Sequence, residues 1–371
     1  MYQRLKDLPL DDFGPLLPGP ACGGQAHVMK IMFDLGCFQH DQTCPKCHAE
    51  CRLQTSTRTK TLKGGREKEF VELSLRSCSK KCRERLHFID NTIWRIIKDR
   101  ILFVFVANAF LNRATTQSVV NDTQCKQKTA EKYMRIIKNA LFLENEAEKR
   151  TMMLGGRDVT VQADESCVFK RKHGVGRILE LTPNEGVFGI VGDKPDGLLF
   201  IQMVRHKDSA TLQSIIKDHV KEGTTIFTDC WPAYNGLNGV NGFKHYTVNH
   251  SENFVEKKPL QMSRDEEREA IRMVVTESEE AEDDAIDEEG IVEEILVFVH
   301  TQKIERTWRE VKRELVNQHI SVLRRNVGVA IFRYNHLNIN IPFNERRKTV
   351  IKTVAKHQLR DGELLRSRYP E

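Results

Sequence analysis

Three acidic residues stand where their carboxylates could act together on bound metal ions. Asp164 and Asp229 each follow a short apolar run that predicts a β-strand, and Glu305 lies early in residues 302–316, whose apolar spacing predicts a long amphipathic helix. Carboxylates from two strand ends and a neighbouring helix form an oxygen-rich site for a hard cation such as Mg²⁺ or Mn²⁺. Two such ions would activate water or a DNA 3′-hydroxyl for in-line attack at phosphorus.

Taken singly, each acid also has an ordinary structural explanation. An aspartate at the end of a strand is more often a turn or cap residue than a ligand. Glu165 directly follows Asp164, so its side chain is expected on the opposite face of the strand, in a structural or supporting role. Only a combination of the three acids therefore indicates catalysis.

The elements around these acids predict an α/β fold with a mixed sheet. A probable helix at residues 209–220 lies between the third and fourth of four β-rich runs, and such an order of strands and helix is typical of α/β domains. The four runs are residues 159–163, 186–191, 198–204 and 224–228.

Two pairs of cysteines near the N-terminus predict one structural zinc ion. Cys44 and Cys47 form a tight pair, and Cys78 and Cys82 form a second pair 30 residues later. Four thiolates at such spacing can close a tetrahedral zinc site in a small ribbon. The alternative is a set of unrelated reduced cysteines. His48 and Cys51 are spare candidate ligands.

The segment before the predicted sheet favours a helix-turn-helix. Thr115 and Thr116 can cap a short helix, and a longer helix begins near Lys128. The longer helix gathers apolar residues on one side (Tyr133, Ile136, Ile137, Ala140 and Leu141) and basic residues on the other (Lys128, Lys132, Arg135 and Lys138). Such a second helix can enter the major groove of double-stranded DNA, although a solvated basic helix would look the same.

The charge distribution favours a polyanionic partner. The 371 residues carry a net charge of +6, but residues 264–294 hold 15 acidic residues against three Arg, a local charge of −12. The rest of the chain has 55 basic and 37 acidic residues, a surplus of 18. Such a surplus attracts nucleic acid or an anionic membrane surface, and composition alone does not separate them.

Other features limit where the protein works. The longest apolar run, residues 101–107, is too short to span a bilayer, so no membrane-spanning segment is expected. No membrane is included among the expected partners. The N-terminus lacks the pattern of a secretory signal, so the ten cysteines are expected to be reduced.

Several blocks of the chain resemble the Merlin-type transposases, whose ISXO-like domain is shared with bacterial insertion-sequence enzymes. Over roughly residues 150–340, the blocks are Ala163-Asp164-Glu165-Ser166 followed by Lys170, Arg171 and Lys172, Thr228-Asp229-Cys230-Trp231-Pro232-Ala233-Tyr234, Val248-Asn249-His250-Ser251-Glu252-Asn253-Phe254-Val255, and His300-Thr301-Gln302-Lys303-Ile304-Glu305 with Trp308 and Lys312. The second and third blocks together are the specific ones.

The resemblance implies a ribonuclease-H-like fold and metal-dependent cut-and-paste transposition by an Asp, Asp, Glu (DDE) triad at Asp164, Asp229 and Glu305. Asn249 and His250 would help to shape the pocket or contact the DNA end. The implied partners are double-stranded DNA, as transposon ends and target, and further copies of the chain in a homo-oligomer. The compartment would be the nucleus in a eukaryote and otherwise the cytoplasm.

The expected domain order follows from these motifs. It comprises a loose leader (1–43), a zinc ribbon (44–88), a helix-turn-helix segment (90–150), a ribonuclease-H-like transposase domain (157–345) and a basic C-terminal tail (346–371). The transposase domain departs from the family in one place, because an acidic insertion at residues 256–299 replaces a short connection. Residues 264–290 have too few apolar side chains to build a core and are predicted to be disordered.

The insertion leaves a second class of function open. The first is a DNA transposase, and the second is a non-catalytic DNA-binding protein retained by its host and derived from a transposase. A nuclease that cleaves without strand transfer would use the same metal site.

Overall fold

The computed structural model describes residues 93–167, 186–193, 197–249, 255–259, 296–315 and 322–357 as continuous stretches. Nearer the N-terminus it describes residues 28, 32, 35–37, 44, 46–49, 51–61, 67–77, 82 and 85–86. The chain divides into two compact units. The first takes Met1–Arg150 together with Asn317–Glu371, and the second takes Thr151–Val316. The second unit is therefore inserted in sequence into the first.

A mixed five-stranded sheet forms the centre of the second unit. Its strand order is β6-β5-β4-β7-β8, with β4, β5 and β6 antiparallel and β4, β7 and β8 parallel. This confirms the predicted mixed α/β sheet and is consistent with a ribonuclease-H-like fold. The strands are β4 (Thr160–Ser166), β5 (Gly186–Gly192), β6 (Leu199–Val204), β7 (Thr225–Asp229) and β8 (Lys244–Val248).

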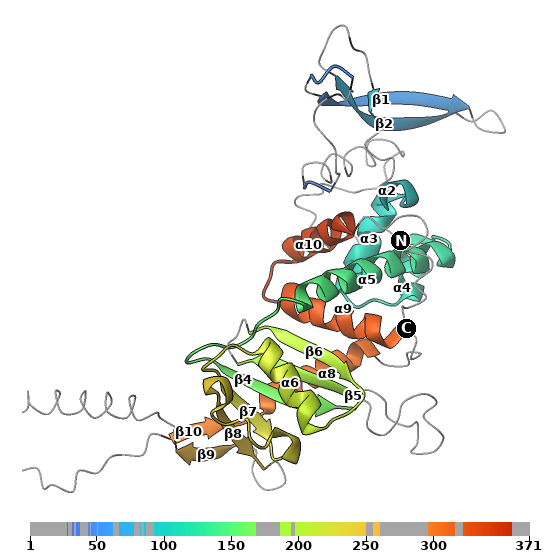
Figure 1. Ribbon diagram of the computed structural model, residues 1–371. Helices are drawn as coiled ribbons and strands as arrows, with labels where there is room; N and C mark the ends of the chain where they lie inside the picture. The colour runs from blue at the N-terminus through green and yellow to red at the C-terminus, as the bar shows by residue number, and fades with distance from the viewer. Residues whose placement is uncertain are drawn as a thin grey trace, which may run out of the picture. The chain divides into compact units, whose positions relative to one another are not determined.

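Two helices cover opposite faces of this sheet (Figure 1). Helix α6 (Ser209–His219) packs its apolar side on one face, where Val161 and Ala163 of β4 lie in the same cluster. Helix α8 (Gln302–Leu315) contacts β4 and β5 on the other face. Because successive side chains of a strand alternate between faces, Gln162 and Asp164 of β4 lie on the α8 side. The 3₁₀ turns η3 (Pro232–Tyr234) and η4 (Val240–Gly242) join β7 to β8.

Asp164 lies inside a strand, not after its end as the apolar run suggested. Strand β4 continues to Ser166 because it remains paired with β5, up to the partners Ser166 and Val187. Its pairing with β7 stops earlier, at Gln162 and Phe227. Asp164 is therefore two residues beyond the parallel pairing while it is still held by the antiparallel pairing.

The two ends of the acidic insertion pair with each other. Strands β9 (Glu256–Pro259) and β10 (Leu296–Val299) form an antiparallel ribbon that leads directly into α8. Val299 is buried in a cluster with Phe227, Tyr246 and Val248. The predicted disorder of residues 264–290 concerns residues outside the described part of the chain.

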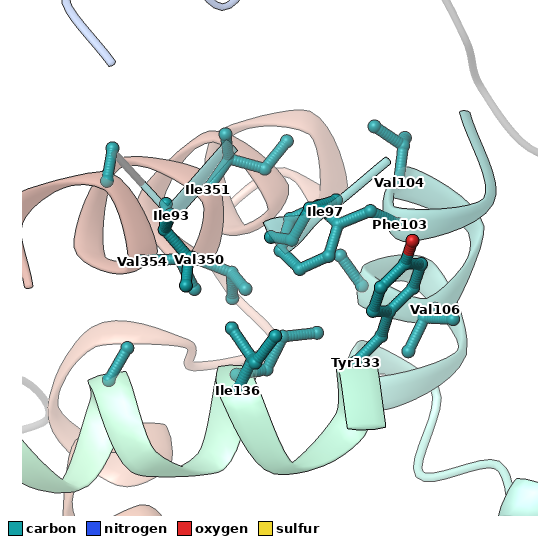
Figure 2. Packing of buried hydrophobic residues seen from close by; sticks show 14 of the residues in the cluster. Ile93, Ile97, Phe103, Val104, Val106, Tyr133, Ile136, Val350, Ile351 and Val354 are labelled. Carbon is teal, nitrogen blue, oxygen red and sulfur yellow. The ribbon is translucent and has the colours of Figure 1, made fainter. Parts of the chain in front are cut away.

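The first unit is mainly helical, with a small antiparallel sheet of order β1-β2-β3. Its apolar core joins N-terminal and C-terminal helices, and Figure 2 shows the side chain of Ile136 directed toward those of Val350 and Val354 on the facing helix. The strands are β1 (Cys51–Thr61), β2 (Glu67–Ser77) and β3 (Arg85–Leu86). The helices are α2 (Ile93–Ile96), α3 (Arg100–Leu111), α4 (Thr116–Thr123), α5 (Gln127–Lys149), α9 (Leu323–His336) and α10 (Phe343–Lys356).

Ion pairs add to the packing of α5 against the C-terminal helices. Glu146 of α5 lies 2.6 Å from Arg324 of α9, and Glu144 contacts Lys356 at the end of α10 at 2.5 Å. The residues that the sequence assigned to the C-terminal tail therefore begin with a packed helix. Within the described residues, no helix is long and apolar enough to cross a membrane.

Candidate active site

Asp164 and Asp229 lie on neighbouring parallel strands. Gln162 of β4 is paired with Phe227 of β7, so two further residues along each strand bring Asp164 beside Asp229. The two carboxylates are close enough to influence each other, because the charge of Asp229 raises the pKa of Asp164. The pairing of β4 with β7 thus unites two acids that are 65 positions apart in the sequence.

The carboxyl group of Asp164 resists ionisation in the absence of a cation. Its pKa is raised from 3.8 to about 7. Burial is the largest cause and the charges of Glu165 and Asp229 also raise the pKa, whereas the hydrogen bond from Trp308 lowers it. A buried carboxylate beside two others is costly because like charges in a poorly solvated site repel. A bound divalent cation would remove this cost, so the oxygen donors suit Mg²⁺ or Mn²⁺.

Helix α8 brings Glu305 to the same face of the sheet. Trp308 is buried, and its Nε1 donates a hydrogen bond of 2.9 Å to Oδ2 of Asp164. Glu305 lies three residues before Trp308 and is exposed. Residues three apart are neighbours on a helix, so Glu305 lies about one turn before the residue that contacts Asp164.

Close packing of Trp308 depends on a glycine opposite Asp164. Gly189 of β5 is the strand partner of Asp164. A Cβ at Gly189 would lie 2.7 Å from Cη2 and 2.8 Å from Cζ2 of Trp308. The indole ring therefore lies directly on the backbone of β5, and the sequence alone gave no sign of this contact.

The opposite face of β4 holds a second carboxyl group. Glu165 accepts a hydrogen bond from the hydroxyl of Tyr234, which is fully buried in η3. Burial raises the pKa of Glu165, the Tyr234 hydrogen bond acts against the shift, and the charge of Asp229 adds to it. The backbone N–H of Trp231 donates to Oδ1 of Asp229 at 3.0 Å. This turn thus contacts both Glu165 and the end of β7.

The three acids of the expected triad do not form a tight cluster. Among the described residues, the one group of three or more Cys, His, Asp or Glu ligand atoms within 4.8 Å of one another is Cys44, Cys47 and Cys82. Asn249 follows the strand partner of Asp229, Val248, at the end of β8. His250, the other expected pocket residue, lies outside the described residues.

Cys44, Cys47 and Cys82 are arranged as zinc ligands would be. The Sγ atoms of Cys44 and Cys82 are 3.7 Å apart. A tetrahedron with Zn–S bonds of about 2.3 Å has an edge of roughly 3.8 Å. The backbone N–H of His48 donates to the carbonyl of Cys44 at 2.8 Å and His48 has φ 53°, so the chain turns tightly around Cys47. Cys78, the expected fourth ligand, lies outside the described residues.

Helices α4 and α5 follow the expected pattern of faces. The hydroxyl of Thr115 accepts a hydrogen bond of 3.1 Å from the N–H of Ser118 and caps α4. A three-residue turn, in which Gln124 is left-handed, leads to α5. All five apolar residues expected on the inner side of α5 are buried. On its outer side Lys128 and Arg135 are exposed, and Lys132 and Lys138 are half-buried.

A comparison with known protein families gives a match over the part of the chain that carries Asp164 and Asp229. Residues 153–281 match the model of the ISXO2-like transposase domain. This match confirms the resemblance to ISXO-like transposases over these residues. The match includes Asp164 and Asp229, whereas Glu305 follows it. A search among curated proteins gave no match.

Proposed function

We propose that the protein is a DNA transposase that cleaves transposon ends and transfers them to target DNA, with Asp164, Asp229 and Glu305 as its catalytic residues. The observation that supports this most strongly is the hydrogen bond between Trp308 and Asp164, since it ties the helix of Glu305 to the strand of the first acid. The transposase-domain match over the two aspartates supports the same conclusion.

The three carboxylates would hold two Mg²⁺ or Mn²⁺ ions. When bound, these ions lower the pKa of the attacking water or 3′-hydroxyl and stabilise the leaving oxygen. Asp164 and Asp229 contribute oxygens from fixed strand positions, and the exposed Glu305 contributes the third from α8. Trp308 holds one oxygen of Asp164, which orients the carboxylate toward the shared site.

The remaining elements of the proposal concern binding. Cys44, Cys47, Cys82 and Cys78 would hold one structural Zn²⁺. Helices α4 and α5 would act as a helix-turn-helix that contacts double-stranded DNA through Lys128, Lys132, Arg135 and Lys138. We propose that the protein works as a homo-oligomer, as the resemblance to transposases implies.

The test is a cleavage assay on DNA that carries the terminal inverted repeats flanking the gene. Asp164→Asn, Asp229→Asn and Glu305→Gln should each lower cleavage by roughly 10³-fold or more, since they remove several kcal/mol of charge stabilisation. Glu310→Gln is the matched control, because Glu310 lies on the same helix and pairs with Arg313.

The outcomes separate the candidate functions. Metal-dependent cleavage followed by joining to target DNA supports a transposase, and cleavage without joining identifies a nuclease. If the unmodified protein binds DNA but does not cleave it, and Glu305→Gln leaves the binding unchanged, the protein is a non-catalytic DNA-binding protein.

A further inference from the structure

A fully buried glutamine joins the strand of Asp164 to the helix of Glu305. Gln162 of β4 has no exposed surface and lies two residues before Asp164, on the same face of the sheet. Its Oε1 accepts hydrogen bonds from the backbone N–H groups of Lys303 at 3.0 Å and Ile304 at 3.1 Å. These donors belong to the first turn of α8, where backbone N–H groups have no partner within the helix.

The other end of the same amide is also satisfied. Nε2 of Gln162 donates to Oδ1 of Asp193 at 3.1 Å and lies 3.2 Å from Nδ1 of His300. The two backbone donors fix which end of the amide faces α8, so Nε2 must face Asp193 and His300. All four hydrogen-bonding positions of the side chain are then used. His300 accepts through Nδ1 and carries its proton on Nε2.

Together with Trp308, Gln162 attaches α8 to β4 at two points. From Lys303 to Trp308 the helix rises about 7.5 Å, and from Gln162 to Asp164 the strand advances roughly 6.8 Å. The two spans are similar in length, and both attachments are present together. Two attachments fix the translation of the helix along the strand and its rotation, and Glu305 lies between them.

We infer that Gln162 is a positioning residue that sets the place of Glu305 relative to Asp164 and so completes the divalent-metal site. This inference rests on the proposed role of the two acids as metal ligands. Gln162 touches no reacting group. It acts by holding the first turn of α8, and Asp193 and His300 keep its amide in the required orientation.

The experiment measures Mn²⁺ binding to the full-length protein by electron paramagnetic resonance, alongside DNA cleavage. Gln162→Met keeps the length and packing of the side chain and removes all four hydrogen bonds. This variant should weaken Mn²⁺ binding about tenfold or more. It should also lower kcat on the order of 10²-fold with little change in KM, because a displacement of a catalytic group by about 1 Å has an effect of this size. Gln162→Glu still accepts from Lys303 and Ile304, so its Mn²⁺ affinity should lie between those of the wild type and Gln162→Met.

A matched control separates positioning from general loss of stability. Thr224, which is fully buried just before β7, accepts from the backbone N–H of Gly156 at 2.8 Å and donates to the carbonyl of Lys221 at 2.5 Å, but it does not hold α8. Thr224→Val keeps the shape of the side chain and removes both hydrogen bonds, so it should lower the melting temperature and leave the Mn²⁺ affinity within about twofold of the wild type. In metal-free protein, the amide hydrogens of Lys303 and Ile304 should exchange faster in Gln162→Met only.

The outcomes distinguish this inference from the proposed function. Wild-type Mn²⁺ affinity in both Gln162 variants would overturn the positioning role. Mn²⁺ binding that depends on Gln162 in a protein that does not cleave DNA would overturn the proposed function and support the positioning role. A wild-type protein that binds no Mn²⁺ would overturn both.

Discussion

Nε1 of Trp308 lies 2.9 Å from Oδ2 of Asp164, a contact between residues 144 positions apart. The indole packs on Gly189, the strand partner of Asp164, so the same ring orients a carboxylate and fills the space above β5. Glu305 is carried on the helix that this contact holds. The geometry of the acidic site is therefore coupled to the packing of one face of the sheet.

Substitution of Gly189 by alanine should disturb the proposed active site without changing any acid. The new Cβ would lie 2.7 Å from the ring of Trp308, so the indole must move away from Asp164. We expect a decrease of about 1–3 kcal/mol in the free energy of unfolding and slower cleavage. A double-mutant cycle with Trp308→Phe checks the mechanism, because the two effects on cleavage should be less than additive. Additive effects would mean that Gly189 acts through another contact.

The stability of the metal-free protein should depend on pH through Asp164. Its pKa is raised from 3.8 to about 7 in the folded state, so between these values the folded protein binds more protons than the unfolded chain. Stability attributable to Asp164 is therefore present below pH 4 and falls as the pH rises toward 7. Asp164→Asn, which still accepts from Trp308, should lack this fall.

The measurement is the melting temperature of the wild type and of Asp164→Asn as a function of pH, once in a chelator and once in Mg²⁺. The difference between the two melting temperatures reports the contribution of Asp164. At pH 8 in the chelator, Asp164→Asn should melt at a higher temperature than the wild type, and Mg²⁺ should narrow or reverse the difference by stabilising the wild type. A wild type that gains stability relative to Asp164→Asn between pH 4 and 7 would contradict the raised pKa.

Zinc removal should unfold the N-terminal cysteine segment selectively. The close approach of Cys44 to Cys82 predicts one bound Zn²⁺, with Cys78 as the fourth ligand. Structural zinc contributes on the order of 10 kcal/mol or more to small units of this kind. Elemental analysis should give one zinc per chain, and Cys44→Ser or Cys78→Ser should abolish it. Cys125→Ser is the control, since Cys125 lies outside this cluster. Protein purified without zinc and unaffected by chelators would refute the site.

The outer side of α5 should contribute charge to DNA binding. Reversal of the charges of Lys132 and Arg135 should weaken binding and flatten the dependence of log affinity on log salt, by roughly 0.9 for each DNA phosphate that is no longer neutralised. The swap Lys132→Arg with Arg135→Lys retains both charges and should leave the slope unchanged. Equal slopes for the reversed and unmodified proteins would exclude α5 as the reader of DNA.

The acidic insertion should compete with DNA for basic surface. Residues 264–290 can be replaced by a short Gly/Ser linker that leaves the paired strands β9 and β10 intact. We expect unchanged thermal unfolding and a DNA affinity that is equal or higher, with the larger gain at low salt, where charge is least screened. A neutral replacement of the same length controls for loop length. Weaker binding by both replacements would mean that the acidic residues do not compete with DNA.

The sequence by itself determined the local elements and the residue types of the site. Alternating and helical apolar patterns predicted β5, β6, α6, β7 and α8 to within a residue or two at each end, because burial of one face leaves its period in the sequence. Asp229 was recognised at the end of β7 for the same reason. The spacing of Cys44 and Cys47 likewise predicted a tight turn, since their interaction is local.

Tertiary structure decided which elements meet. Apolar periodicity shows that one face of an element is buried, but it does not show which element packs on that face. The sequence therefore did not predict that β4 pairs with β5 beyond its apolar run, which places Asp164 inside a strand. Neither Gln162 nor Gly189 carries a chemical signal of its own. Their roles arise only where α8 lies on β4 and β5, through contacts between residues more than 100 positions apart. The packing of α9 and α10 with the N-terminal helices was hidden for the same reason, because an apolar helix face is satisfied by any partner of matching shape.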